Sequence, residues 1–117
     1  MATQVLSNDP GQPDEQILSE LVRRIVDSVK PLRIILFGSA VRGEMGPNSD
    51  LDVLVIMPDG IHRRQTAQKA YKSLRALGVS KDVIVVTESD VREHSENHSL
   101  VLHPALRDGK DLYHAIG

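Results

Sequence analysis

Two short apolar runs constrain the fold of this chain more than any other feature of its sequence. Residues 32–37 lie between a proline and a glycine, and residues 51–57 are apolar and rich in β-branched side chains in their later part. Runs of this length that turn residues bound are more typical of buried strands than of helices. Residues 82–87 predict a third strand, and residues 112–114 are a candidate for a short last one.

Helical periodicity appears before and between these strands. Residues 14–29 carry an apolar stripe, with acidic residues at the start and Lys30 followed by a proline at the end. Residues 40–44 could form one helical turn. Residues 61–77 predict a longer helix that Gly78 terminates.

The last third of the chain predicts two further helices. Ser89 is the expected N-cap of a short helix that reaches Glu93 or beyond. Another helix is expected over residues 100–108, with Pro104 in its first turn, where a missing N–H is harmless. The resulting order indicates an α/β (α+β) domain whose helices pack against a small sheet. The sheet should be mixed, because a loop joins its first two strands.

Composition limits the class of protein. The 117 residues suit one domain, and we expect a flexible tail over residues 1–13 and a single domain over residues 14–117. The absence of cysteine excludes disulfides, thiolate metal sites and cysteine nucleophiles, and fits a cytoplasmic location. No apolar run is long enough to span a membrane. A net charge of −2 and three aromatic residues disfavour nucleic acid as a partner without excluding it.

Three aspartates form the first candidate site. Asp50 and Asp52 are two residues apart at the start of a predicted strand, so their side chains should share one face. Asp82 starts the next strand. Carboxylate oxygens are the ligands that magnesium prefers, and three of them on one face repel one another unless a cation lies between them. Each aspartate taken alone is more often a solvated residue at a strand end.

Gly38 and Ser39, which follow the first strand, form the second candidate site. Glycine permits a close backbone approach, and the amides of a following turn could bind phosphate oxygens. A strand-ending glycine with a serine cap is the commoner interpretation of the pair alone. The spacing of Gly38 and Gly43 matches a P-loop, but Glu44 and Met45 stand where that motif needs lysine and a hydroxyl.

Together these segments resemble the minimal nucleotidyltransferases of the polymerase-beta-like nucleotidyltransferase superfamily. The family pattern is G-S, a short spacer, then S-D-x-D followed by apolar residues. The chain has it as GSAVRG at residues 38–43 and NSDLDV at residues 48–53, and an Arg-Gly pair after the G-S is typical of minimal members. Asp82, in KDVIV, resembles the third catalytic carboxylate, and residues 105–113 resemble the usual closing segment. The resemblance spans residues 15–114.

The resemblance implies a polymerase-beta-like palm with a two-part site. Asp50 and Asp52 would hold magnesium ions, and Asp82 would complete the metal site and help deprotonate the attacking hydroxyl. Gly38 and Ser39 would cradle the β- and γ-phosphates of a nucleoside triphosphate. A nucleoside monophosphate, AMP from ATP, would pass to an acceptor hydroxyl, and pyrophosphate would leave.

Two cationic features have two interpretations each. Arg42 would neutralise triphosphate charge, or it pairs with Glu44 on the surface. The predicted helix over residues 61–77 is basic and contains no acidic residue. It is either a solvated face or a docking surface, and the scarcity of aromatic residues favours a protein partner over RNA.

The resemblance also implies a partner. Larger family members hold their acceptor on an additional helical domain, and we expect none here, so a separate subunit would supply the acceptor. Stand-alone minimal domains often pair with a small helical HEPN protein as the antitoxin of a toxin–antitoxin system, and some adenylylate the toxin. The alternative is a non-catalytic protein of the same fold that masks a partner toxin.

Overall fold

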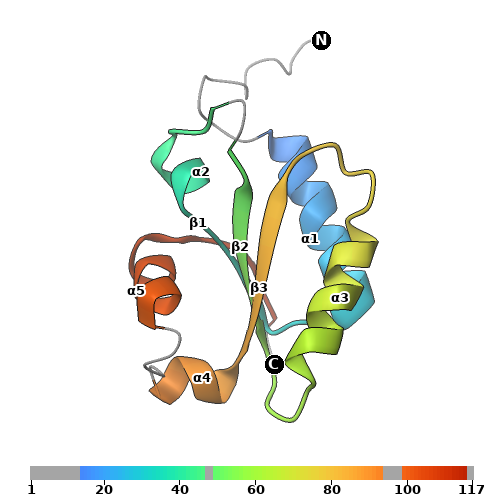
Figure 1. The fold of residues 1–117 in the computed structure, drawn as a ribbon, viewed down its shortest axis with the longest axis vertical. Helices are drawn as coiled ribbons and strands as arrows, with labels where there is room; N and C mark the ends of the chain where they lie inside the picture. The colour runs from blue at the N-terminus through green and yellow to red at the C-terminus, as the bar shows by residue number, and fades with distance from the viewer. Residues whose placement is uncertain (1–13, 47–48, 94–98, 116–117) are drawn as a thin grey trace.

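Helices cover both faces of a four-stranded sheet in the part of the chain that the computed structural model describes, residues 14–46, 49–93 and 99–115 (Figure 1). The elements in chain order are α1 (Glu15–Val29), β1 (Arg33–Phe37), α2 (Ser39–Arg42), β2 (Leu51–Met57), α3 (Arg63–Ser73), β3 (Lys81–Thr87), α4 (Glu88–Glu93), α5 (Ser99–Asp108) and β4 (Lys110–His114). The predicted tail over residues 1–13 lies outside the described residues.

The sheet has the strand order β3-β2-β1-β4. β1 runs antiparallel to β2 and β4, whereas β2 and β3 are parallel. The parallel pair needs a crossover connection, and α3 provides it. A register shift in β1 between Ile34 and Ile35 adjusts its pairing with β4. The predicted class, an α/β (α+β) domain with a small mixed sheet, is confirmed.

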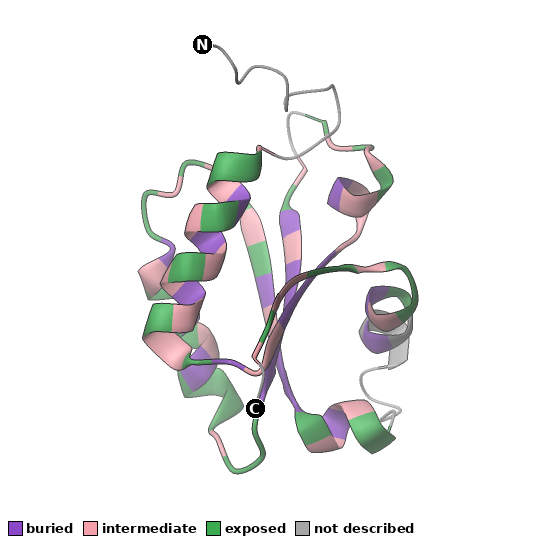
Figure 2. Ribbon diagram, turned by 180° about the vertical axis from the view of Figure 1, so that it is seen from behind, coloured by how far each residue is buried: buried purple, intermediate pink, exposed green. Residues whose placement is uncertain are grey.

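Strand alternation divides the core into two clusters, one on each face of the sheet. One cluster lies between the sheet and the helices α1 and α3 and includes residues of several strands. Its members from β2 are Leu51, Val53, Val55 and Met57. The smaller cluster on the opposite face joins the strands to α5. In Figure 2 the strands β1, β2 and β3 are mostly buried and β4 is not, while α1 shows buried stripes toward the sheet.

The helix α1 begins and ends as its sequence predicts. The Asp14 side chain accepts a hydrogen bond from the Gln16 N–H at 2.8 Å and so caps the first turn. Lys30 takes a left-handed conformation, with a φ of 52°, and its N–H bonds the Val26 carbonyl. This is a common helix ending, and it directs the chain into β1.

Two predicted helices differ in detail. α3 covers Arg63–Ser73 rather than 61–77, because the chain beyond Ser73 changes to i→i−3 bonds, such as that from Leu77 N–H to the Leu74 carbonyl. Pro104 is not in the first turn of α5. That helix begins at Ser99, so Pro104 lies in its interior and removes one backbone bond there.

The start of α4 also corrects a prediction. Ser89 lies inside α4, and Thr87 occupies the capping position instead. The Thr87 N–H donates to Asp90 at 2.9 Å, and the Asp90 N–H donates to the Thr87 hydroxyl at 3.2 Å. This reciprocal pair has the pattern of a capping box. Ser89 bonds Asp59 through both its N–H and its hydroxyl.

Candidate functional site

Two of the predicted site residues lie side by side at the start of the parallel strands. Asp52 and Asp82 are register partners in β2 and β3, and Asp50 immediately precedes β2. By strand alternation, Asp52 is on the face of Leu54 and Ile56, opposite α1 and α3. The same alternation places Asp82 on that face. The sheet therefore brings the predicted carboxylates to one face and one end.

The pKa of Asp52 is shifted by the carboxylates that lie near it. Burial raises the pKa of Asp52, and the charges of Asp82 and Asp50 raise it further, while Arg42 lowers it by a smaller amount. A half-buried carboxylate beside two like charges is costly to ionise. A bound cation would remove that cost, so the raised pKa marks a place where positive charge is favourable.

The donor set fits magnesium in its chemistry. Magnesium prefers carboxylate oxygens together with phosphate oxygens and water, and the three aspartates supply oxygen ligands only. The described residues contain no group of three or more acidic or histidine side chains that is already gathered closely enough to hold a metal ion. The carboxylates share a face, and a metal would have to draw them together.

Gly38 joins the predicted phosphate site to Asp52. It follows β1 and precedes α2, with a φ of +78° that side chains of L-residues rarely allow. A Cβ atom at this position would overlap Asp52 Oδ2. The Gly38 carbonyl accepts bonds from the N–H groups of Val41 and Arg42 and so starts the short helix. Glycine is therefore required both by conformation and by space.

The structure shows one of the two predicted interactions of Arg42. Its Nε lies 2.7 Å from Glu44 Oε1, and both side chains are about 60% exposed. The same guanidinium also acts on Asp52, whose pKa it lowers. Arg42 thus forms an ion pair with Glu44 on the surface, and its charge also acts on the carboxylate of Asp52.

Tyr71 lies in the carboxylate site although no motif of the sequence indicates it. Its hydroxyl donates to Asp82 Oδ1 at 3.2 Å and accepts from the Val83 N–H at 2.9 Å. Tyr71 is also 39% exposed. No sequence signal pairs this helix residue with the start of β3, because the contact depends on how α3 crosses the sheet.

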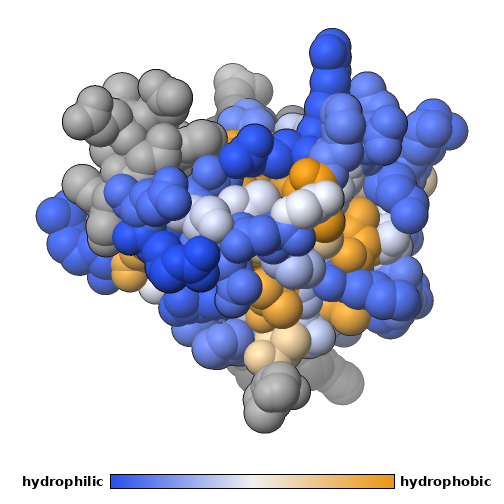
Figure 3. Space-filling view, turned by 90° about the horizontal axis from the view of Figure 1, so that it is seen from below, coloured by the Kyte–Doolittle hydropathy of each residue, from blue (hydrophilic) through white to orange (hydrophobic). Residues whose placement is uncertain are grey.

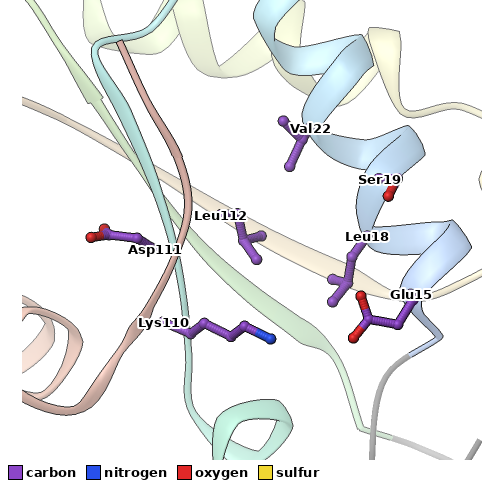
Figure 4. Close-up of a pocket in the computed structure, with 7 residues that line it drawn as sticks. All are labelled: Glu15, Leu18, Ser19, Val22, Lys110, Asp111 and Leu112. Atoms are coloured by element: carbon purple, nitrogen blue, oxygen red, sulfur yellow. The ribbon is translucent and has the colours of Figure 1, made fainter. Parts of the chain in front are cut away.

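Of the cavities that the described residues line, one lies beside α2 and another beside α1. One, of about 210 Å³, is beside the predicted phosphate site and is lined by Phe37, Gly38, Val41, Arg42, Pro104 and Asp108. The other, of about 360 Å³, lies between α1 and β4 (Figure 4) and is lined by Glu15, Leu18, Ser19, Val22, Lys110, Asp111 and Leu112. Only the first contains predicted site residues.

The cationic helix retains part of its predicted docking face. Arg63 forms two bonds with Asp90, at 3.0 and 2.8 Å, so its charge is engaged within the fold. Exposed cationic side chains remain on α3 and just after it: Arg64, Lys69, Lys72 and Arg75. We call these four residues the cationic face.

The face at the lower end of the molecule is mainly polar (Figure 3). Seen from below, it is largely hydrophilic, with apolar side chains in a few small areas (Figure 3). Within the described part of the chain, every helix is too short or too polar to cross a membrane.

Comparison with known proteins identifies the family. Residues 18–104 match the model of the nucleotidyltransferase domain family. No match to a curated protein was found. The crystal structure of a toxin–antitoxin complex with AMP-PNP contains a chain that is 25% identical, with a TM-score of 0.61, and the match covers 84% of this chain and 73% of that one.

Two further solved structures share the fold. A chain of the MntA–HepT toxin–antitoxin complex is 23% identical with a TM-score of 0.56, covering 86% of this chain and 73% of that one. A complex of the tri-AMPylated HEPN toxin of Shewanella oneidensis with its MNT antitoxin gives 22% identity and a TM-score of 0.54, covering 86% and 72%. Since the family model covers most of the sequence and these neighbours share its sheet and helices, this chain belongs to the nucleotidyltransferase domain family and fits its minimal members.

Proposed function

We propose that this chain is a magnesium-dependent nucleotidyltransferase that moves a nucleoside monophosphate, AMP from ATP, onto a hydroxyl group of a separate protein. The observation that carries the proposal is the register match of Asp52 and Asp82 in parallel strands, with Gly38 packed against Asp52. Membership of the nucleotidyltransferase family supports the reaction class. A similar chain in a complex with AMP-PNP supports an adenine nucleotide as the donor.

The triphosphate would lie between the aspartates and the first turn of α2. Asp50, Asp52 and Asp82 would hold magnesium, which when bound neutralises their charge and that of the phosphates. The first N–H groups of a helix have no partner within it. The backbone N–H groups that follow Gly38 at the start of α2, together with the Ser39 hydroxyl, would donate to β- and γ-phosphate oxygens. Arg42 would add positive charge nearby.

Transfer is a single displacement at the α-phosphorus. The acceptor oxygen forms a bond to that phosphorus, and the bond from the phosphorus to the oxygen that bridges it to the β-phosphate breaks. Pyrophosphate leaves with the electron pair of that bond. Asp82 accepts the proton of the attacking hydroxyl. It suits this role because it is exposed at the edge of the sheet, where an acceptor can approach.

The proposed acceptor is a small helical protein of the HEPN type, with this chain acting as its antitoxin in the cytoplasm. Three structural neighbours are toxin–antitoxin complexes, and in one the HEPN toxin carries AMP groups. The cationic face of α3 would contact an acidic surface of such a partner, since opposite charges accelerate association.

Intact-mass spectrometry tests the proposal. The chain is incubated with ATP, magnesium and a candidate partner of the HEPN type, and the partner should gain the mass of one adenylyl group or more. The Asp50→Asn and Asp52→Asn variants should leave the partner unmodified. A partner that binds tightly to the wild-type chain yet stays unmodified would instead support a non-catalytic protein that masks its toxin.

A further inference from the structure

The strand that carries Asp82 is held at its outer edge by a tyrosine from α3. β3 is an edge strand, so half of its backbone N–H groups have no neighbouring strand to bond. Tyr71 covers one of them, because its hydroxyl oxygen accepts from the Val83 N–H at 2.9 Å. The same hydroxyl lies 3.2 Å from Asp82 Oδ1.

These two contacts fix the direction of the hydroxyl proton. The Val83 N–H is a donor, so it bonds a lone pair of the Tyr71 oxygen. An ionised carboxylate only accepts, so the single hydroxyl proton is directed at Asp82. The backbone thus orients the hydroxyl, and the hydroxyl in turn orients the carboxylate.

Asp82 needs such a restraint. It is exposed, lies near the start of an edge strand and shares a face with two other carboxylates. An exposed aspartate can adopt several staggered rotamers, and repulsion from Asp52 favours those that turn away from it. A hydrogen bond to Oδ1 opposes that rotation. Among the described residues, Oδ2 has no hydrogen-bond partner and is the oxygen that can face a substrate.

We propose that Tyr71 is a positioning residue that holds the Asp82 carboxylate in the rotamer used for nucleotidyl transfer. The inference rests on the proposed function for the role of Asp82, but the restraint itself can be measured without any turnover. Tyr71 acts through Asp82 and is not assigned a contact with the nucleotide.

The Tyr71→Phe variant isolates the hydroxyl. It keeps the aromatic ring and removes only the hydroxyl, and water can bond the Val83 N–H at the edge of the sheet, so the fold should persist. Tyr113→Phe is the matched control, since it removes a hydroxyl from β4 at the opposite edge of the sheet. Thermal unfolding of both variants checks that each is folded.

The first measurement is the rotamer of Asp82, from three-bond NMR couplings across its Cα–Cβ bond. Wild type and Tyr113→Phe should show one dominant rotamer, and Tyr71→Phe should show averaging. A single unchanged rotamer in folded Tyr71→Phe would overturn the proposal. This measurement tests whether Tyr71 restrains the Asp82 side chain, even if no nucleotidyl transfer is found.

The second measurement is the rate of transfer to the HEPN-like partner as magnesium is varied. Tyr71→Phe should lower the maximal rate by about three- to tenfold, the effect of one hydrogen bond, and should raise the magnesium concentration needed for half-maximal rate. Tyr113→Phe should change neither. Normal kinetics in Tyr71→Phe, with transfer still abolished by Asp52→Asn, would remove Tyr71 from the mechanism while leaving the proposed function in place.

Discussion

Gly38 faces the carboxylate of Asp52 so closely that a Cβ atom on Gly38 would overlap Asp52 Oδ2. The two residues are neighbours because Phe37, the last residue of β1, pairs with Asp52. A predicted phosphate-binding residue and a predicted metal ligand are therefore in direct contact. Any side chain at position 38 would disturb both halves of the candidate site together.

The Gly38→Ala variant should lose transfer by about a hundredfold or more, because it displaces a metal ligand that contributes several kcal/mol to the reaction. Its φ of +78° adds backbone strain. Ser39→Ala is the control, since it removes one neutral hydrogen bond and should cost a few-fold to about tenfold. Initial rates of adenylylation measure both. Equally mild effects would exclude a phosphate and metal role for this segment.

The Asp52→Asn variant should separate catalysis from stability. Transfer should fall by about a hundredfold or more, since a neutral amide compensates the cation poorly. The metal-free protein should become more stable at neutral pH. The pKa of Asp52 is raised by burial and then by Asp82 and Asp50. The folded chain therefore loses stability as pH rises above the pKa of an aspartate in the unfolded chain, about 3.9.

Thermal unfolding with and without magnesium tests whether Asp52→Asn stabilises the metal-free protein. Without magnesium, Asp52→Asn should melt above wild type at pH 7, and the difference should vanish at low pH, where the wild-type carboxyl is protonated. A lower melting temperature at neutral pH would show that Asp52 makes a stabilising contact instead.

Local rules predicted the shared face of the aspartates. The i, i+2 spacing and the buried residues that alternate with them placed Asp50 and Asp52 on one side of β2. The register that sets Asp82 beside Asp52 depends on the crossover through α3. The contact from Tyr71 depends on the same crossover, and no short-range pattern contains that information.

Side-chain partners at helix ends were harder to predict for a related reason. Several residues near the start of α4 are typical caps, and the choice depends on tertiary contacts. Ser89 is drawn to Asp59, which leaves Thr87 and Asp90 to form the cap. Arg63 looked like part of a solvated cationic face, but Asp90 holds it by two bonds across 27 positions of sequence.

The Arg63–Asp90 pair should make stability depend on pH in the acid range. Burial raises the pKa of Asp90, but the bonds from Arg63 and the Thr87 N–H outweigh it and hold that pKa below its usual value. This stabilisation is complete above the unfolded pKa of about 3.9 and is lost as pH falls through the lower folded value. Asp90→Asn should cost about 2 kcal/mol at pH 7 and flatten the dependence of stability on pH below about pH 4, measured by urea unfolding. If the free energy of unfolding of Asp90→Asn still fell with pH in the acid range as in wild type, the Arg63–Asp90 pair would not contribute to the stability of the fold.

Gly109 should tolerate no side chain. It follows α5, and a Cβ atom there would overlap the Ala105 carbonyl and the Ile35 side chain. Because backbone oxygen cannot move aside cheaply, Gly109→Ala should destabilise the chain by about 1–3 kcal/mol. Gly46→Ala is the control, since a Cβ atom at that position meets nothing within 4 Å. Equal unfolding midpoints for the two variants would contradict the tight approach of α5 to β1.

The last prediction concerns the cationic face. Arg63 is unsuitable as a probe because its substitution would disrupt Asp90, so we choose Lys69→Glu combined with Lys72→Glu, both exposed on α3. Association with the HEPN-like partner should slow by about tenfold at low salt and by less at 0.15 M, where the Debye length is about 8 Å. The dissociation rate should change little.

A control with the same change in charge makes this result specific. Arg107→Glu with Lys110→Glu reverses two exposed charges at the end of α5 and the start of β4, away from α3. Stopped-flow association at two salt concentrations compares the variants, and calorimetry with ATP and magnesium should give wild-type affinity for both, because the aspartates are untouched. If both variants slow association equally, the effect comes from net charge alone, and the cationic face is a solvated helix surface rather than a docking site.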